Sequence, residues 1–254
     1  MLQVGMVCDG EPQGRQRPRH PLASDPEGLA PAAIGGGFVP VTQPFEQFLS
    51  WMQETLAPHR AQVLGLLDGQ RPDTLAHQQR VARLGTAIAR ALGRDDSEVA
   101  GVCVAGLLHD CGMEGAAFNV FDEHGVVADM QERFRQHPVI GYKLLKESEF
   151  PWPIAQIVRQ HHERLDGSGW PAGLSGTAIL PEAQLVAIAD VFDAIFIIHR
   201  RKPARGVKYA CEELQQQRGV KLNAEAVDAC IGLFQAGFAW EPERYPFSMD
   251  TDAG

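Results

Sequence analysis

Seven side chains that can bind divalent metal ions recur along the chain in short, separated blocks. Five of the nine histidines belong to these blocks, and two aspartates complete them. In chain order the seven residues are His77, His109, Asp110, His137, His161, His162 and Asp190. Imidazole nitrogens and carboxylate oxygens suit first-row divalent metals, and one ion with an open position takes only three or four protein ligands. The set therefore predicts at least two metal ions.

A pair of metal ions points to one class of reaction. Two ions about 3.5 to 4 Å apart can stabilise both the attacking and the leaving oxygen of a phosphodiester. We therefore expect metal-assisted hydrolysis of a phosphate ester. The blocks taken singly also have a structural reading, in which His161 and His162 form a solvated helix end and Asp190 is a buried aspartate satisfied by the backbone. Their recurrence in order favours the metal site.

Three blocks carry a family resemblance. Residues 161–171 read HHERLDGSGWP and are similar to the HHExxDGxGYP signature of the HD-GYP branch of the HD phosphohydrolase superfamily. The segments 189–194 (ADVFDA) and 137–141 (HPVIG) match two further blocks of that branch, and the resemblance covers residues 73–240. The signature loop consists of Asp166, Gly167, Gly169, Trp170 and Pro171.

The resemblance implies an all-α HD-domain helical bundle with a buried two-metal site. Members of the HD-GYP branch hydrolyse the bacterial messenger cyclic di-GMP to linear pGpG and GMP. One ion would be held by His77, His109, Asp110 and Asp190. The second would be held by Asp110, His137, His161 and His162, so Asp110 bridges the ions and is the expected catalytic residue. Iron, manganese and zinc all accept this ligand set.

One departure from the family bears on activity. The family reads His-Asp, two residues, then Lys, whereas this chain has Met113 at the lysine position. A thioether supplies no positive charge to a phosphate, and losing such a group typically costs about two to three orders of magnitude in rate. Two alternatives therefore stand beside the phosphodiesterase: a weak or inactive cyclic di-GMP receptor or adaptor, and an HD hydrolase of another nucleotide phosphoester. The signature loop argues against the second.

Two further departures concern a partner and a third metal. Trp170 replaces the tyrosine of Gly-Tyr-Pro, in a loop that the family associates with contacts to diguanylate cyclase (GGDEF) domains. Asp73 lies four residues before His77, where some members place a glutamate that binds a third ion. Helix N-capping by Asp73 or Thr74 is the alternative reading.

An anionic substrate must be attracted by a few local cationic groups, because the chain as a whole is negatively charged. The formal net charge of −9 argues against a nucleic-acid polymer as partner, because that would need clustered Lys and Arg. Lys202 falls on the lysine position with which the family binds the dinucleotide, whereas His199 fills the arginine position. Arg200 or Arg201 would then substitute for that arginine, and a solvated basic turn is the alternative.

The helix that should lie at the centre of the bundle is residues 181–198. It is apolar nearly all round and has Pro181 at a favourable first position. An ionised carboxylate buried in such a helix costs several kcal/mol unless it is paired or binds a metal, so Asp190 needs a cation. Asp193 lies on the same face, and we interpret it as structural.

Other helices follow from the same periodicity. One starts near residues 73–74 and runs to Gly93, and another opens with Asp95 and Glu98 at capping-box spacing and delivers the His-Asp pair from its last turn. We expect further helices at about 137–149, 153–163, 207–218 and 223–238. Strand signals are sparse, so the sequence predicts a helical bundle with ligands projecting inward.

Composition divides the chain into four parts. Residues 1–44 contain seven Gly and seven Pro and are expected to be flexible. Residues 45–70 form a helical lead-in that either docks a partner or packs on the bundle, residues 71–240 form the HD-GYP-like domain, and residues 241–254 form a tail. No charge-free apolar run of 18 residues occurs, and five cysteines without a CxxC pair fit a reducing compartment. We therefore expect a cytoplasmic protein.

Overall fold

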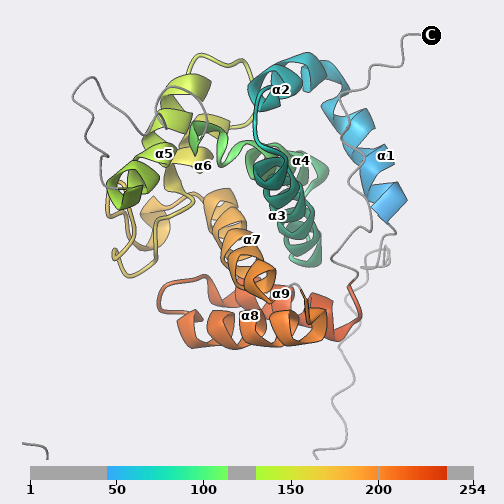
Figure 1. Cartoon of the computed structure of the whole chain (residues 1–254), viewed down its shortest axis with the longest axis vertical. Coiled ribbons are helices and arrows are strands. Elements are labelled where there is room, and N and C mark those ends of the chain that lie inside the picture. Colours follow the sequence, from blue (N-terminus) through green and yellow to red (C-terminus); the bar gives the residue numbers. More distant parts are fainter. Residues whose placement is uncertain (1–44, 114–129, 200, 239–254) are drawn as a thin grey trace, which may run out of the picture. The chain divides into compact units, whose positions relative to one another are not determined.

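The computed structural model describes residues 45–113, 130–199 and 201–238. Within these ranges the regular elements are all helices (Figure 1). They are α1 (Phe45–Leu56), α2 (Arg60–Leu67), α3 (Pro72–Ala91), α4 (Asp96–Leu108), α5 (Met130–Leu145), α6 (Ile154–Gln160), α7 (Pro181–Ile198), α8 (Pro203–Gln217) and α9 (Ala224–Gln235), with the short 3₁₀ turns η1 (Ala57–His59), η2 (Cys111–Met113) and η4 (Gly176–Ala178). The predicted all-α class is confirmed.

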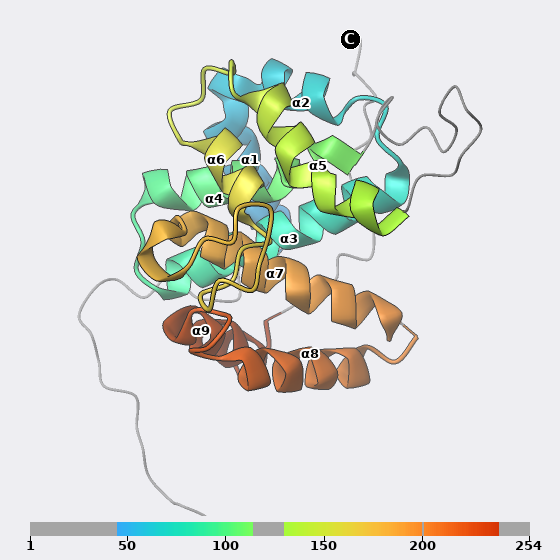
Figure 2. The ribbon, with the colours of Figure 1, turned by 90° about the vertical axis from the view of Figure 1, so that its left-hand side faces the viewer.

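Helix α7 is the central element that the sequence predicts, with the same bounds. It packs against α3, α4 and α6 on one side and against α8 and α9 on the other, as Figure 2 shows. Its Phe192 and Phe196 are among the largest fully buried side chains of the described residues. Asp190 and Asp193 are therefore carried by a helix that the rest of the bundle surrounds.

Helices α3 and α4 lie in close contact and bring two ligand blocks together. A Cβ on Gly106 of α4 would stand 2.6 Å from the Cα of Ala82 in α3, so only glycine permits this approach. The predicted capping box of α4 is confirmed, because Glu98 N donates to Asp95 Oδ1 at 2.8 Å and Asp95 N donates to Glu98 Oε2 at 3.2 Å. The ligands at the end of α4 thus sit against α3.

The predicted N-cap of α3 is wrong. The helix begins at Pro72, its N-cap is Arg71, and no side chain caps it. Proline suits the first helical position because the backbone N–H that it lacks would have no intrahelical partner there. Asp73 therefore lies inside the first turn, where an acidic side chain still favours the helix dipole. At the other end the helix stops before Gly93, which has a φ of +69°, as predicted.

Helix α5 differs most from its prediction. It begins at Met130 rather than at His137, ends at Leu145 rather than at 149, and contains Pro138 in its interior. A proline there leaves the carbonyl of Phe134 without its usual donor. His137 Nδ1 lies 2.5 Å from that carbonyl oxygen and takes the missing donor's place. The histidine thus makes the internal proline tolerable.

Helices α1 and α2 form the predicted lead-in, interrupted by η1 at Pro58. Both pack against α4. Their inward side chains belong to the same core as the other helices; these are Phe48, Met52, Leu56, Val63 and Leu67. Among the described helices, none combines the length and apolarity needed to cross a lipid bilayer. The predicted flexible segment 1–44 and tail 241–254 lie outside the described residues.

Candidate metal centre and its cavity

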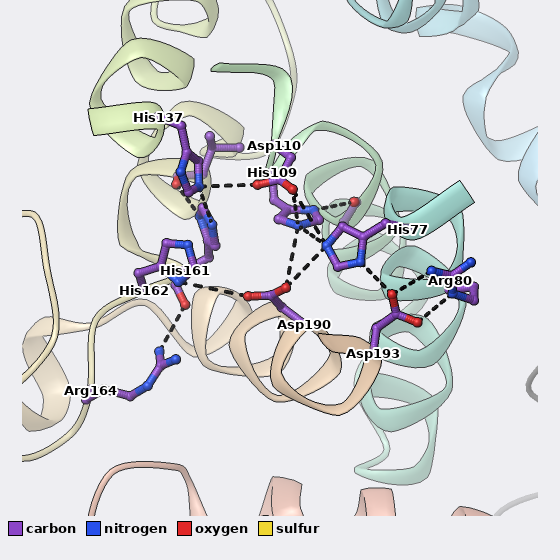
Figure 3. Close-up of polar contacts among 12 residues, drawn as sticks. His77, Arg80, His109, Asp110, His137, His161, His162, Arg164, Asp190 and Asp193 are labelled. Atoms are coloured by element: carbon purple, nitrogen blue, oxygen red, sulfur yellow. Dashed lines mark hydrogen bonds and ion pairs between the residues drawn. The ribbon is translucent and has the colours of Figure 1, made fainter. Parts of the chain in front are cut away.

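The seven predicted ligands meet in one place, although they come from five helices. Figure 3 shows their side chains pointing toward one another. One is carried by α3, two follow the end of α4, one is in α5, two follow the end of α6 and one is in α7; in that order they are His77, His109 and Asp110, His137, His161 and His162, and Asp190. Of these helices, α3, α4 and α6 pack on α7, and α5 packs on α6. The bundle core therefore holds the cluster in place.

At one end of the cluster, His77, His109 and Asp190 offer ligand atoms that lie within 4.8 Å of one another. His77 Nε2 is 3.1 Å from His109 Nε2 and 3.3 Å from Asp190 Oδ1. Ligand atoms that share one ion at about 2.0 to 2.2 Å lie about 3 to 3.5 Å apart. The spacing of this group matches a single metal ion.

At the other end, His137, His161 and His162 form a second such group, and all three residues are buried. His137 Nε2 lies 3.1 Å from His161 Nε2. The ring nitrogens of His162 have no hydrogen-bond partner, and Nδ1 lies 3.9 Å from the Oδ2 of Asp190. This group matches a second ion.

Asp110 lies between the two groups. Its Oδ2 is 3.6 Å from His77 Nε2 and 3.5 Å from His109 Nε2. Its Oδ1 is 3.2 Å from the Nε2 of His137. Each carboxylate oxygen therefore faces a different group, which is the geometry that a bridging ligand needs.

Backbone carbonyls set the orientation of three histidine rings. In His109, His137 and His161 the Nδ1 atom lies 2.8, 2.5 and 2.6 Å, respectively, from the carbonyl oxygen three residues earlier. Since a carbonyl only accepts, Nδ1 carries the proton in each ring and Nε2 presents a lone pair to the cluster. A hydrogen bond of this kind commonly fixes the tautomer of a metal-binding histidine.

The ring nitrogens of the three buried histidines His137, His161 and His162 are suited to binding a cation. Burial lowers the pKa of His137, and it lowers that of His161 well below the usual value, helped by the neighbouring His162. Both rings are therefore neutral, and two Nε2 lone pairs face each other across 3.1 Å. Burial likewise lowers the pKa of His162 to about 3. A metal ion between these nitrogens would satisfy all three rings at once.

The other end of the cluster is dominated by carboxylates. Burial alone would lower the pKa of His77, but the bonds to Asp190 and Asp193 outweigh it and raise that pKa to about 10. Burial would raise the pKa of Asp190, yet His77 and the other histidines hold it well below its usual value. Asp190 is thus ionised, and this end of the cluster favours positive charge.

Asp193 supports the cluster from behind. Its Oδ2 lies 2.6 Å from His77 Nδ1, and its two oxygens accept from Arg80 Nε at 2.5 Å and Nη2 at 2.8 Å. The side chain is fully buried. The structural role expected of Asp193 is thus specified: it orients the ring of a ligand, as second-layer carboxylates commonly do.

Glu163 holds the signature loop against the cluster. Its buried carboxylate accepts from Ala172 N at 2.7 Å and from Leu174 N at 2.9 Å. The loop also folds back so tightly that a Cβ on Gly169 would stand 2.4 Å from the Cα of Glu163. The sequence shows the glutamate in the motif, but its role follows only from the fold of the loop.

Trp170 is the loop residue that reaches the cluster. Its ring stacks on His162 with centroids 4.5 Å apart and planes 22° apart. The Trp170–Pro171 peptide bond is cis. The indole N–H of Trp170 is buried and has no hydrogen-bond partner. Trp170 therefore keeps the aromatic surface expected at the tyrosine position and carries a buried indole N–H in place of the hydroxyl.

A cavity of about 680 Å³ opens beside the cluster. One end is lined by His77, Asp110, His162 and Asp190 together with Phe134, Arg164 and Trp170. The other end is lined by α7 and α8 through Val191, Ala194, Ile195, Tyr209, Glu212, Glu213, Gln216 and Gln217. The size is in the range of small-molecule sites. Sequence reasoning missed Arg164 and the whole α8 wall, since charged and amide side chains on a helix usually mark a solvated face.

Several predicted site residues lie apart from this cavity. Asp73 has a 92% exposed side chain whose recorded partner is Arg71 at 4.0 Å, so the structure does not bring it to the cluster. Arg201 and Lys202 are exposed at the start of α8 and are not among the described residues that line the cavity. Arg200 lies outside the described residues. Met113 is half-buried in η2 and does not line the cavity either.

Several known proteins are similar to this chain in sequence, and one solved structure is similar in fold. A family model described as "HD domain" matches residues 63–225. The cyclic di-GMP phosphodiesterase response regulator RpfG of Xanthomonas campestris is 38% identical over 161 residues, which cover 62% of this chain and 43% of that protein. The 3'3'-cGAMP-specific phosphodiesterase 3 of Vibrio cholerae is 28% identical over 190 residues, which cover 73% and 40%. The chain thus spans less than half the length of these two relatives.

A solved structure agrees with the helical arrangement. Bd1817, an HDG"Y"P protein from Bdellovibrio bacteriovorus, superposes with a TM-score of 0.53 at 20% identity, over 73% of this chain and 61% of that one. This likeness supports the fold of the bundle. The family model matches most of the described residues, so the chain belongs to the HD-domain family, as the resemblance of its motifs implies.

Proposed function

We propose that this chain is a metal-dependent phosphodiesterase that hydrolyses a cyclic dinucleotide, with cyclic di-GMP as the expected substrate. The observation that carries the proposal is the pair of neutral, buried nitrogens of His137 and His161, which face each other at 3.1 Å beside an open cavity. Such an arrangement is costly without a cation, and a cation beside a cavity of this size is available to a ligand.

The ligand sets follow the two groups of side chains. His77, His109, Asp110 and Asp190 would hold one ion, and Asp110, His137, His161 and His162 would hold the other. When bound, a pair of such ions supplies Lewis acidity toward a phosphoryl group and an activated water. The set contains nitrogen and oxygen ligands without sulfur, so iron, manganese and zinc all fit it.

The chain's own side chains would orient the substrate. Arg164 lines the cavity next to His162, and its Nη1 donates to the carbonyl oxygens of His161 at 3.2 Å and Glu163 at 2.8 Å. A guanidinium has five N–H donors in a planar fork that matches phosphate oxygens. Arg164 is therefore the cation that we expect to contact the phosphate, in a chain that has Met113 where the family has lysine.

A second function has one observation in its favour. Met113 carries no charge and does not line the cavity, so the charge that the family's lysine supplies is missing. A metal-loaded protein that binds cyclic di-GMP without rapid turnover would behave as a receptor or adaptor. The contact between the Trp170 loop and diguanylate cyclase domains remains a prediction that these comparisons do not address.

The proposed activity can be tested by identifying the reaction products of protein whose metal content is known. Protein purified without oxygen, with its metal content measured, would be incubated with cyclic di-GMP and the products separated by chromatography. We expect pGpG or GMP, and we expect a chelator to abolish their formation and added metal to restore it. Intact substrate at about two bound metals per chain would contradict the phosphodiesterase and favour the receptor, whose affinity for the dinucleotide would be measured next.

A further inference from the structure

Part of the cavity lining comes from α8 rather than from the helices that carry the predicted metal ligands. Tyr209, Glu213 and Gln217 are spaced four residues apart, so they lie on one stripe of the helix. All three are partly buried and all three line the cavity. Beside them, α7 contributes Val191 and Ile195, which give this end of the cavity an apolar floor.

The polar groups on this stripe are held in place. Gln217 Nε2 donates to Glu213 Oε1 at 2.7 Å, which orients the carboxylate. Arg205 donates to the hydroxyl of Tyr209 from Nε at 2.9 Å and from Nη2 at 2.7 Å, and the ring of His199 lies 4.7 Å from that of Tyr209. The stripe thus combines a fixed aromatic ring, a fixed carboxylate and an amide.

We propose that Tyr209, Glu213 and Gln217 form a base-recognition subsite that holds one guanine of the cyclic dinucleotide and discriminates against adenine. This inference rests on the proposed function and adds the identity of the base. The ring of Tyr209 and the apolar floor would contact the faces of the purine. Glu213 would accept from its edge, and the amide of Gln217 would keep Glu213 in position.

The choice of guanine follows from hydrogen-bond chemistry. Guanine presents two adjacent donors, N1–H and N2–H₂, which one carboxylate can accept together. Adenine presents an acceptor at N1 beside its amino donor, so a carboxylate meets one repulsive contact instead of a second bond. Each good bidentate pair discriminates between bases by about 1 to 3 kcal/mol, which is about 5- to 150-fold in binding. Glu213 is thus the residue expected to set the preference.

The charges of the cavity fix the direction in which the dinucleotide would lie. With its ions bound, the metal end would carry positive charge, to which Arg164 adds, whereas Glu212 and Glu213 make the α8 end negative. Phosphates are therefore attracted to the metal end and repelled from α8. The neutral base, which offers donors, is the part of the ligand that α8 can accept.

The experiment compares three substrates on the full-length, metal-loaded protein. For cyclic di-GMP, 3'3'-cGAMP and cyclic di-AMP we would measure kcat/KM and, with the metals present, equilibrium binding. Because one subsite reads one base, we expect cyclic di-GMP and 3'3'-cGAMP to be used within about 3-fold of each other, and cyclic di-AMP about 5- to 150-fold less well. Glu213→Gln should remove the preference for guanine and improve the use of cyclic di-AMP, because an amide can accept from the amino group of adenine and donate to its N1.

Glu212→Gln is the matched control, because it removes the same charge from the neighbouring position of α8. Glu212 is exposed and lies 3.7 Å from Lys208 Nζ, so it is oriented toward a surface pair. The preference for guanine should survive this change. An unchanged preference in Glu213→Gln, or a lost preference in Glu212→Gln, would overturn the assignment of Glu213. Binding without hydrolysis in the unaltered protein would contradict the proposed function alone, and the ratios of the binding constants would still decide the subsite.

Discussion

The two ends of the cavity are built in different ways. The metal end takes its seven predicted ligands from α3, α4, α5, α6 and α7, buries four of them (His109, His137, His161 and His162), and fixes three rings through backbone carbonyls. The α8 end takes its polar groups from one helix, leaves them partly exposed, and fixes them through each other. The geometry of the metal end is therefore determined by the core of the bundle. The side chains of the α8 end can be substituted without disturbing that core.

The largest effect should come from Asp110, whose two oxygens face both metal groups. In Asp110→Asn the side chain keeps its shape and loses its charge, so we expect at least a thousand-fold fall in hydrolysis, in line with other essential catalytic groups. Metal content should fall in parallel, since a bridging ligand is lost. Because the base-binding end is untouched, the fall should be equal for all cyclic dinucleotides that the protein uses.

Asp228→Asn is a suitable control for that change. Asp228 is an exposed aspartate of α9 whose partner is Arg218. It should retain full metal content and full activity. If Asp110→Asn kept near-normal hydrolysis at unchanged metal occupancy, Asp110 could not be the bridging residue, and the division of the cluster into two ion sites would be wrong.

Substitution of Asp193 should reduce metal affinity by a smaller factor, because Asp193 contacts the predicted metal ligand His77 but does not line the cavity. Asp193→Asn weakens the bond that orients His77 and removes a negative charge beside Arg80. Loss of such a second-layer partner typically costs about 10- to 100-fold in metal affinity. Titration of metal-depleted protein would measure this shift. Hydrolysis should return at saturating metal if the role is positioning, and a loss that excess metal cannot repair would show that Asp193 does more.

Breaking the contact between Glu163 and the loop should have a moderate effect. Glu163→Gln replaces an ionised acceptor of two backbone N–H groups by a neutral amide, at a cost of about 1 to 3 kcal/mol in the free energy of unfolding. The stacking of Trp170 on His162 should loosen with it, so we expect KM to rise about 10-fold, which is equivalent to 1.4 kcal/mol. Denaturant unfolding and steady-state kinetics measure the two effects.

The kinetics of Glu163→Gln also separate the two ends of the cavity. The loop contacts the metal end, so KM should rise by the same factor for guanine- and adenine-containing dinucleotides. A change in the ratio between these substrates would mean that the loop takes part in base recognition. It would then contradict the assignment of selectivity to α8.

The grouping of the seven side chains could be predicted from the sequence because metal binding restricts the residue types. Only a few side chains bind divalent metals, and their repeated occurrence in His77, the His-Asp pair, His137, the double histidine and Asp190 is improbable without a shared site. The helices could be predicted for the same kind of reason, since apolar periodicity and the Asp95 capping box are local signals. Expectations that depend on local pattern were therefore mostly correct.

The rest depended on contacts that local pattern does not contain. The helix predicted at about 137–149 begins at Met130 instead, and the donor that makes Pro138 tolerable inside α5 is a side chain, His137 Nδ1. The position of Asp73 at the expected helix start suggests a cap, and its spacing from His77 suggests a third metal, but α3 begins at Pro72 and the Asp73 side chain is 92% exposed. Glu213 gave no signal at all, because a glutamate on a helix looks the same in solvent and in a cavity.

The smallest predicted effect concerns Met113, the residue that departs most from the family. Met113→Lys adds a cation to η2, next to the His-Asp pair. The metal end already has Arg164 in the cavity, whereas Met113 does not line it. The added lysine would thus supplement a charge that is present, so we expect turnover of cyclic di-GMP to rise by less than about 10-fold, well below the two to three orders of magnitude of a lost oxyanion donor.

Met113→Gln separates charge from shape, since glutamine is similar in length and neutral. It should leave turnover unchanged, and neither variant should alter the ratio between guanine- and adenine-containing substrates, because no residue of η2 lines the cavity, whereas α8 does. A rise of 100-fold or more in Met113→Lys would show that the missing lysine limits the reaction and that Arg164 does not replace it. In that case the metal end of this chain, although complete in its ligands, would be incomplete in its charge.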